Sequence, residues 1–308
     1  MSVAKGIRKS ISRIVQHNWK LYIFLLPGLI WLITFCYVPM YGVLIAFKDF
    51  DSRLGITGSP FVGLKYFRQF FSTNIASTTI MNTLMLGIET TAFVFPVPIL
   101  FALLLNQLPS PRFKKTIQTI SFAPHFISTV VLVSIMNIIL APKSGFVNQL
   151  IVSLGGKPVF FTTQSAYFRP LYIGSSIWQS MGYNAIIYLS ALTSVSPDLH
   201  EAAVVDGASK LQRIWHIDLP CILPTIVIML ILQLGKLFSS SYEKALLMQN
   251  ALNTNVSELI STYVYKVGLT NAQYSFSTAV GLFNSLVNFS LLITSNFISR
   301  RFTDTSLF

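Results

Sequence analysis

The chain has 308 residues, of which 53% are hydrophobic and only 10% are charged, and its mean hydropathy is +0.63. Globular domains carry about 25% charged residues, so this composition excludes an ordinary soluble domain and predicts an integral membrane protein. The net charge of +12 comes from Lys and Arg spread over loops and chain ends, which favours a membrane surface over nucleic acid as the partner. Cys36 and Cys221 form neither a disulfide framework nor a metal-ligand pattern.

The first twenty residues contain five Lys or Arg and no acidic residue, which predicts a basic cytoplasmic segment over 1–20. The apolar run that follows, 21–47, is far longer than the roughly 7–15 apolar residues of a signal peptide and has no small-residue cleavage site. We therefore expect it to remain as the first transmembrane helix. Pro27 and Pro39 are expected to kink it or end it early.

Five further apolar runs each supply about the 20 residues that a bilayer core of about 30 Å requires. They predict spans at 81–105, 116–140, 170–195 and 219–238, and a last one that ends at Ser299. Outer segments are predicted at 48–79, 141–169 and 239–274, with short helices near 64–71 and 257–267. The predicted fold is an all-α integral membrane protein with about six transmembrane helices over 21–299.

Basic residues set the predicted orientation. Arg112, Lys114 and Lys115 lie in the tight connection between the second and third spans, which predicts a cytoplasmic turn. An even number of spans places both termini on the same side, so residues 300–308 are predicted to be a cytoplasmic tail.

The stretch 196–220, SPDLHEAAVVDGASKLQRIWHIDLP, holds four of the ten acidic residues and is therefore predicted to lie in water. Ser196, Pro197 and Asp198 indicate a helix start. Gly207 can end this helix, and the pair Ser209 and Gln212 has the spacing of a capping box for a second one. We expect a helix-turn-helix knob whose first helix buries an apolar side made of Leu199, Ala202, Ala203 and Val205. The alternative, an amphipathic loop on the lipid surface, would be richer in Lys and Arg.

A specific spacing occurs within this knob: E-A-A, three residues, G, nine residues, I-x-L-P. It is met by Glu201, Ala202, Ala203, Gly207, Ile217, Leu219 and Pro220. The stretch resembles the cytoplasmic motif of the membrane subunits of binding-protein-dependent ABC importers. The resemblance implies that the knob, including Asp206, docks in a groove of an ATPase subunit, where Glu201 meets a basic residue. His200, which departs from the residues expected before the motif, is predicted to be a solvated knob residue and not a catalytic one.

The likeness extends over most of the chain, through 18–50, 55–67, 261–269 and 279–302. These segments resemble carbohydrate permeases that import oligosaccharides and polysaccharide fragments in Gram-positive bacteria. The resemblance implies a plasma-membrane assembly of two different permeases, two copies of a cytoplasmic ATPase and an extracellular sugar-binding lipoprotein. The chain has no G-x-x-x-x-G-K-[ST] loop. ATP and Mg are therefore expected to be used by the ATPase subunits, with no cofactor or metal bound by this chain.

Polar residues at membrane depth are costly unless they face a cavity or another helix, so they are candidates for a glycan path. Those predicted here are Trp178, Gln179, Tyr183, Gln233, Tyr242, Glu243, Asn284 and Asn288. Amide, carboxylate and aromatic groups suit the hydroxyls and ring faces of sugars. The alternative is helix packing, in which Asn284 and Asn288 bond across an interface and Gly182 and Gly281 allow close approach.

Two ionisable residues inside the spans leave other functions open. Three places are open for Glu89: paired with a base in the partner permease, lining the path, or near a membrane face. A structural partner is the preferred prediction. His125 is predicted to be packed or hydrogen-bonded. A secondary transporter would use Glu89 and His125 as an ionisable pair but would leave the knob without a role. A membrane glycosyltransferase is a second alternative, and it is opposed because the water-facing segments of this sequence lack a carboxylate cluster. An ABC permease for amino acids or peptides is opposed only by the extended likeness to carbohydrate permeases.

Overall fold

The structure is a computed structural model that describes residues 19–239 and 242–303. The predicted basic segment 1–20 therefore lies almost wholly outside the described residues, as does most of the predicted tail 300–308. Within the described ranges the chain forms helices and loops, with one isolated antiparallel bridge between Lys48 and Phe61. The predicted all-α class is confirmed.

Four helical stretches of the described residues are long and apolar enough to cross a bilayer: Trp19–Phe47, Asn74–Asn106, Lys210–Leu234 and Tyr274–Arg301. A bent pair, Pro111–Phe126 with Thr129–Ile139, makes a fifth if it is counted as one span. The helix α11 (Ser165–Leu192), with 28 residues, is long enough but less apolar. These six pieces correspond to the six predicted spans.

The first span is one continuous run of α2 (Trp19–Leu32), a π-helical turn η1 (Ile33–Tyr37), α3 (Val38–Met40) and a 3₁₀ segment η2 (Tyr41–Phe47). Pro27 lies inside α2 without ending it. The π turn directly precedes Pro39, where the proline lacks an N–H for the regular hydrogen-bond ladder. Neither proline stops the span, and only Pro39 coincides with a change of helix type.

The second span begins at α6 (Asn74–Phe93) and continues as α7 (Pro96–Asn106), so it starts earlier than predicted. The hydroxyl groups at its start do not stop the helix because they bond to carbonyls within it. Thr79 and Thr83 are both fully buried, and their hydroxyls donate to carbonyls one turn earlier, at 2.8 and 2.6 Å.

The predicted span over 116–140 is present, but it is not one continuous helix. The segment is divided into α8 (Pro111–Phe122), η3 (Ala123–Phe126) and α9 (Thr129–Ile139), which meet at 98°. Pro124 lies within η3, Ile127 is extended, and the Ser128 hydroxyl caps α9 by accepting a hydrogen bond from the Val131 N–H at 3.3 Å. A new helix therefore starts inside the apolar run.

The remaining helices complete the bundle. The knob consists of α12 (Pro197–Val205), α13 (Lys210–Arg213) and a π-helical turn η4 (Ile214–Asp218), which leads into α14 (Leu219–Leu234). The last span is α18 (Tyr274–Thr303), which runs past the predicted end at Ser299 and through Arg300 and Arg301. Short helices occupy the predicted outer segments: α4 (Gly55–Gly58), α5 (Lys65–Phe71), α10 (Phe146–Ser153), α15 (Tyr242–Met248), α16 (Thr254–Ser257), α17 (Ile260–Tyr265) and η5 (Lys266–Thr270).

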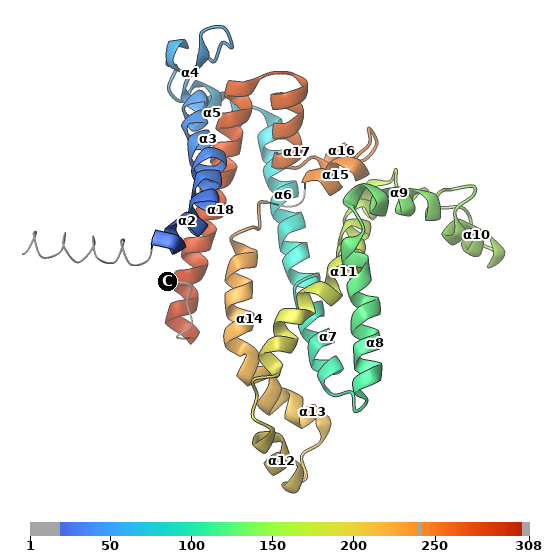
Figure 1. Ribbon diagram of the computed structural model, residues 1–308. Coiled ribbons are helices and arrows are strands. Elements are labelled where there is room, and N and C mark those ends of the chain that lie inside the picture. The colour runs from blue at the N-terminus through green and yellow to red at the C-terminus, as the bar shows by residue number, and fades with distance from the viewer. Residues whose placement is uncertain (1–18, 240–241, 304–308) are drawn as a thin grey trace, which may run out of the picture.

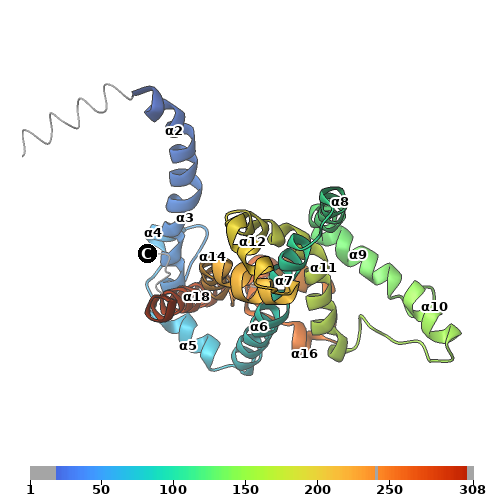
Figure 2. The same ribbon diagram turned by 90° about the horizontal axis from the view of Figure 1, so that it is seen from below.

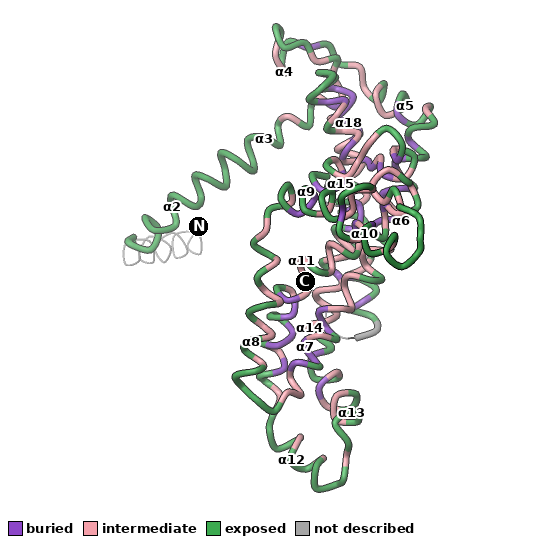
Figure 3. Tube along the Cα trace, turned by 90° about the vertical axis from the view of Figure 1, so that its right-hand side faces the viewer, coloured by how far each residue is buried: buried purple, intermediate pink, exposed green. Residues whose placement is uncertain are grey.

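The bundle has two ends. Figure 1 shows α12, α13 and the turn between α7 and α8 at the lower end, whereas α4, α5 and α17 lie at the upper end. The helix α2 projects away from the other helices in Figure 2, and Figure 3 shows it exposed along its length. The predicted inner and outer connections therefore segregate to opposite ends.

Three clusters of buried side chains hold the bundle together. The first joins α7, α11 and α14 around Ala102, Tyr188 and Ile222. The second joins α5, α17 and α18 around Phe70, Ile260 and Val280, and the third lies between α6, α11 and α15 around Leu86 and Tyr172. The helix α11 thus takes part in two of the three clusters.

Candidate functional site

A cavity of about 880 Å³ lies between the upper part of α18, the helices α15 and α17, and the first span. We call it the tyrosine cavity and define it by the residues Tyr242, Ser261, Tyr265, Tyr274, Gly281 and Asn284. Met40 and Val43 of the first span contribute apolar surface. Two of the residues predicted for a glycan path, Tyr242 and Asn284, are therefore brought together here.

The tyrosine cavity combines aromatic faces with unused polar groups. The rings of Tyr242 and Tyr265 stack with their centroids 5.6 Å apart and an interplanar angle of 27°. Ser261 Oγ and Asn284 Oδ1 have no hydrogen-bond partner among the described residues. Buried polar atoms are normally paired, so a site with ring faces and free hydrogen-bonding groups can receive a polyhydroxylated ligand with apolar faces.

Asn288, one turn beyond Asn284 on α18, has a different role. Its Oδ1 accepts a hydrogen bond from the Phe238 N–H at 2.9 Å, and its Nδ2 donates to Ser239 Oγ at 2.8 Å. Both ends of the amide are used where the chain leaves α14. The geometry therefore favours the helix-packing interpretation for Asn288.

The predicted residues of α11 support the bend between α8 and α9. Gln179 Nε2 donates to the Ile127 carbonyl oxygen at 2.8 Å. The Tyr183 ring stacks on His125, with centroids 3.8 Å apart and an angle of 4°. The prediction that His125 is a packed residue is thus confirmed. Trp178 is about half exposed on the same helix.

The other two predicted path residues lie elsewhere. Gln233 lines a smaller cavity of about 250 Å³ together with Asn184, Tyr188 and Lys236. Glu243 is exposed at the first turn of α15. The eight predicted residues therefore do not form one face, and Tyr265, Ser261 and Tyr274 complete the tyrosine cavity without having been predicted.

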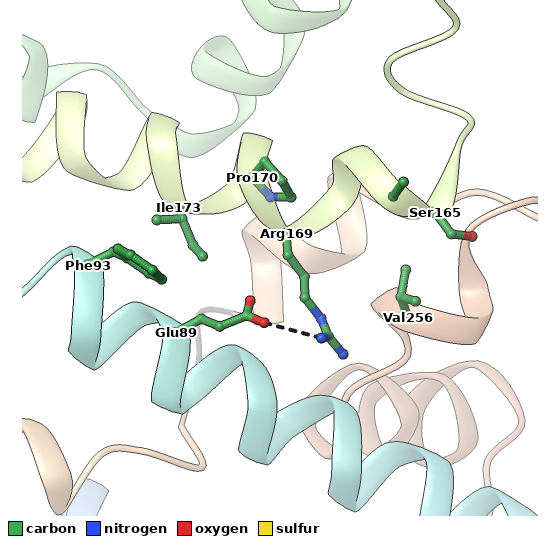
Figure 4. A pocket seen from close by; sticks show the side chains of 8 residues that line it. Glu89, Phe93, Ser165, Arg169, Pro170, Ile173 and Val256 are labelled. Carbon is green, nitrogen blue, oxygen red and sulfur yellow. Dashed lines mark hydrogen bonds and ion pairs between the residues drawn. The ribbon is translucent and has the colours of Figure 1, made fainter.

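Glu89 forms an ion pair within the chain. Its Oε1 lies 3.2 Å from Arg169 Nη1, and both side chains line a cavity of about 560 Å³ between α6, α11 and α16 (Figure 4). Arg169 also donates to Asn82 Oδ1 at 3.4 Å. The preferred prediction of a structural partner holds, but the base lies in this chain and not in a second permease, and Glu89 also lines a cavity. The partner is Arg169 of α11, a residue predicted to end an outer segment.

A buried amine was not predicted. Lys244 of α15 donates to the Tyr172 carbonyl oxygen at 3.1 Å and to Ser176 Oγ at 2.8 Å, and it lies 4.8 Å from the centre of the Tyr172 ring. Burial lowers the pKa of Lys244 to about 7. Its position in a polar loop sequence gave no sign of this burial.

The knob has the local structure that its sequence predicts. Ser196 Oγ accepts from the Asp198 N–H at 3.3 Å, and Ser209 and Gln212 form a capping box. At the end of α12 the Ala208 N–H bonds to the Ala203 carbonyl and the Gly207 N–H bonds to the Val204 carbonyl, which is a Schellman turn. Gly207 supplies the φ of +77° that this turn requires.

The apolar residues of the knob are not buried within the chain, and this prediction is wrong. Val205 is 87% exposed and Trp215 is 64% exposed, and Leu199 and Leu211 are exposed as well. The reason is that α12 and α13 extend beyond the bundle, where no other helix of the described residues covers them (Figure 3). Glu201, Ala202, Asp206 and Pro220 are exposed, whereas Ala203, Ile217 and Leu219 are half-buried at the base of the knob.

The prediction of a solvated His200 is also wrong. Its Nε2 lies 3.3 Å from Oδ1 of Asp218, a carboxylate that is fully buried. Asp218 Oδ2 accepts a further hydrogen bond from Gln107 Nε2 at 2.8 Å. The knob is therefore tied by polar contacts to the end of α7.

Comparisons with known proteins agree with this architecture. Two relatives from Bacillus subtilis (strain 168) match almost the whole chain. Protein LplB is 41% identical over 308 residues, covering 100% of this chain and 96% of LplB. The polygalacturonan/rhamnogalacturonan transport system permease protein YteP is 42% identical over 301 residues, covering 98% of this chain and 94% of YteP.

A solved structure is similar as well. A chain of a bacterial ABC transporter involved in the import of the acidic polysaccharide alginate superposes with a TM-score of 0.89 and 38% identity, over 96% of this chain and 99% of that one. The same values hold for that transporter in complex with an alginate pentasaccharide-bound periplasmic protein. Residues 94–304 match the model of the binding-protein-dependent transport system inner membrane component family. Together with the apolar helices and the exposed knob, these matches show that the chain is a multi-pass membrane protein of that family and a permease subunit of an ABC transporter.

Proposed function

We propose that this chain forms half of the path by which an oligosaccharide or polysaccharide fragment, delivered by an extracellular binding protein, crosses the membrane in an ATP-driven importer. The tyrosine cavity carries this proposal. Its stacked Tyr242 and Tyr265 rings offer apolar faces, and Ser261 and Asn284 offer polar atoms without partners. Sugars present hydroxyls and apolar ring faces together, and this combination fits them.

The relatives support a carbohydrate over a peptide or an amino acid. YteP is named for polygalacturonan and rhamnogalacturonan, and the similar solved transporter imports alginate. Both proteins are similar to this chain over nearly its full length. The similarity therefore includes the outer segments and α18, which build the tyrosine cavity.

The knob supports a partner that supplies energy. We place its exposed apolar side chains and Glu201 against a cytoplasmic ATPase, of which two copies serve two different permeases and which binds the ATP and Mg. The coupling residues in this proposal are Glu201, Ala202, Ala203, Asp206, Gly207, Ile217, Leu219 and Pro220. Burying residues such as Val205 and Trp215 in a groove would remove their apolar surface from water.

The same proposal fixes the orientation. The knob and the basic turn at Arg112, Lys114 and Lys115 lie at one end of the bundle. That end is cytoplasmic in the proposed assembly, as are both termini, and the tyrosine cavity lies toward the extracellular lipoprotein.

Rival functions receive less support from the geometry. A gradient-driven transporter would need Glu89 and His125 as an ionisable pair, yet Glu89 pairs with Arg169 and His125 stacks on Tyr183. Neither residue contacts the other in the described structure.

Reconstitution in proteoliposomes tests the proposal. The chain, the second permease, the ATPase and the binding protein are assembled together and then with each component left out in turn. Uptake of a labelled oligogalacturonide is compared with uptake of a labelled tripeptide. We expect glycan uptake that needs ATP and all four components. Uptake driven by a proton gradient alone, uptake without the second permease, or tripeptide import would contradict it.

A further inference from the structure

A fully buried carboxylate lies at the base of the knob. Asp218 ends the π-helical turn η4, directly before α14 begins at Leu219, and its side chain has no exposed surface. A carboxylate removed from water is stable only where charged or hydrogen-bonding groups compensate it. The partners of Asp218 therefore show which parts of the chain this group holds together.

Two partners come from different elements. Gln107, which follows the last residue of α7, donates from Nε2 to Asp218 Oδ2 at 2.8 Å. His200 of α12 places Nε2 3.3 Å from Asp218 Oδ1, close enough for an ion pair with a protonated imidazole but not aligned as a hydrogen bond. The positive charge of Arg213 also favours the carboxylate, and its Nε is buried without a hydrogen-bond partner among the described residues. The knob, the start of α14 and the end of α7 thus meet at one side chain.

The residues beside Asp218 extend this junction into the bundle. Ile214 and Leu219 pack against the buried cluster of α7, α11 and α14, which includes Leu103, Leu189 and Ile222. The base of the knob is therefore embedded among the spans, whereas its far side is open. A displacement applied to the far side reaches the spans through this base.

Neighbouring residues of α12 face the two sides of the knob: His200 faces the embedded base and Glu201 faces the open far side. Successive helical residues point about 100° apart because a turn contains 3.6 residues. The Glu201 side chain is exposed, and His200, with a quarter of its side chain exposed, turns inward to Asp218. The residue proposed to meet the ATPase thus stands next to the residue that reaches the core.

We propose that Asp218 is a positioning residue that, with His200 and Gln107, makes the knob and the end of α7 move as one body. The three side chains form a polar link, and this inference rests on the proposed coupling role of the knob. When the ATPase shifts the knob, the link carries the shift to α7, which packs along α11. Without the link the ATPase still docks, but part of the knob movement is lost in local rearrangement.

The test uses the full complex in proteoliposomes, with His200→Ala, Gln107→Ala and Asp218→Asn as variants. Glycan uptake per ATP hydrolysed and the amount of ATPase retained are measured for each. We expect full retention and an uptake per ATP that falls about ten-fold for Gln107→Ala, the factor that corresponds to its one charge-assisted hydrogen bond to Asp218, and by a smaller factor for His200→Ala, which removes an ion-pair contact. His200→Gln, which keeps a donor, should recover part of the loss. His200→Ala should add little to Asp218→Asn, because both act through one carboxylate.

Matched controls come from the same elements. Asp198→Asn removes an exposed acid of α12, and Asn106→Ala removes the amide beside Gln107 that accepts from Lys114. Both should keep the wild-type ratio. Asp218→Asn alone can fail to fold, but His200→Ala and Gln107→Ala decide the question without it.

Three outcomes overturn the link. The first is a wild-type uptake per ATP in the His200 and Gln107 variants. The second is a lower yield or thermal stability with an unchanged ratio in each assembled complex, which assigns the cluster to structure alone. The third is loss of ATPase retention, which would mean that His200 belongs to the surface that binds the ATPase. Absence of ATP-dependent uptake in the wild type would instead refute the proposed function.

Discussion

Gly182 of α11 lies so close to Ser121 of α8 that a Cβ added to Gly182 would stand 2.2 Å from the Ser121 carbonyl oxygen. The contact is with backbone, which cannot turn aside as a side chain can. The two helices therefore approach each other at a distance that only glycine allows, immediately before the bend at η3.

Gly182→Ala should destabilise the fold by about 1–3 kcal/mol, the range for inserting an extra carbon into a packed interior. Gly174→Ala on the same helix is the matched control, because no heavy atom lies within 4 Å of a Cβ at that position. Thermal unfolding in detergent measures the difference. Equal melting temperatures for the two variants would show that α8 and α11 can separate without cost.

The knob gives a second prediction. Glu201→Ala should reduce stimulated ATP hydrolysis by about ten-fold to a hundred-fold, because one partly buried charge-assisted hydrogen bond is lost. Gly207→Asp should reduce stimulation by about five-fold to thirty-fold, since φ is +77° there and a left-handed backbone costs about 1–2 kcal/mol for a residue with a side chain. Hydrolysis and ATPase retention are measured in the purified complex. Wild-type values for both variants would mean that this stretch is not the coupling site.

The tyrosine cavity gives a third prediction. Tyr242→Ala, Tyr265→Ala and Asn284→Ala should each lower glycan uptake several-fold at unchanged complex yield, because they remove a ring face or a free amide. Asn288→Ala is the contrasting variant on α18. It should lower thermal stability, because its two hydrogen bonds hold the chain after α14, and leave uptake per assembled complex unchanged. Normal uptake in the three cavity variants together with reduced uptake in Asn288→Ala would mean that the glycan does not bind in the tyrosine cavity.

The ion pair between Glu89 and Arg169 gives a fourth prediction. Glu89→Gln and Arg169→Gln should each cost about 1–3 kcal/mol of stability, since each leaves a partly buried charge without its partner. The double variant should cost less than the sum of the two. Lys65→Gln is the control, because the Lys65 and Asp49 pair is about half exposed and such pairs contribute little. Additive costs would show that the charges act independently.

Lys244 gives a prediction for pH dependence. Burial lowers its pKa from the ordinary lysine value of 10.5 to about 7 in the folded chain, so between these two pH values the unfolded chain binds more protons at this site. Stability contributed by this group therefore rises with pH across that window, with a slope of up to about 1.4 kcal/mol per pH unit. Lys244→Met should flatten the rise when melting temperature is measured from pH 7 to pH 10. An identical slope in the variant would show that Lys244 does not titrate there.

Local signals predicted much of the fold and the knob. The Ser209 and Gln212 capping box, the turn at Gly207 and the start of α12 at Pro197 depend on residues within one or two helical turns. Spacing alone can therefore identify them. The length of apolar runs likewise placed six helical segments at about the right positions.

Contacts between distant residues could not be predicted in this way. Glu89 pairs with Arg169 across 80 positions, and Gln107 reaches Asp218 across 111. The bend at η3 was missed because the apolar run continues on both sides of Pro124 and Ser128, so hydropathy does not change where the direction does. Four of the glycan-path residues, Gln179, Tyr183, Gln233 and Asn288, have their own partners or cavities, because helical spacing gives the face of a helix and not what covers it.

The length of α18 determines the depth at which a sugar would first be received. Its 30 residues extend for about 45 Å at 1.5 Å per residue, which exceeds a hydrocarbon layer of about 30 Å. With Arg300 and Arg301 at one headgroup layer, roughly twenty residues of an upright helix reach the opposite layer near Val280. Tyr274 then lies in the hydrated interfacial zone, Gly281 at its boundary, and Asn284 about one helical turn inside the hydrocarbon layer. A glycan can enter the tyrosine cavity at this boundary while it keeps much of its hydration shell, so the main dehydration penalty falls on a later stage of its passage.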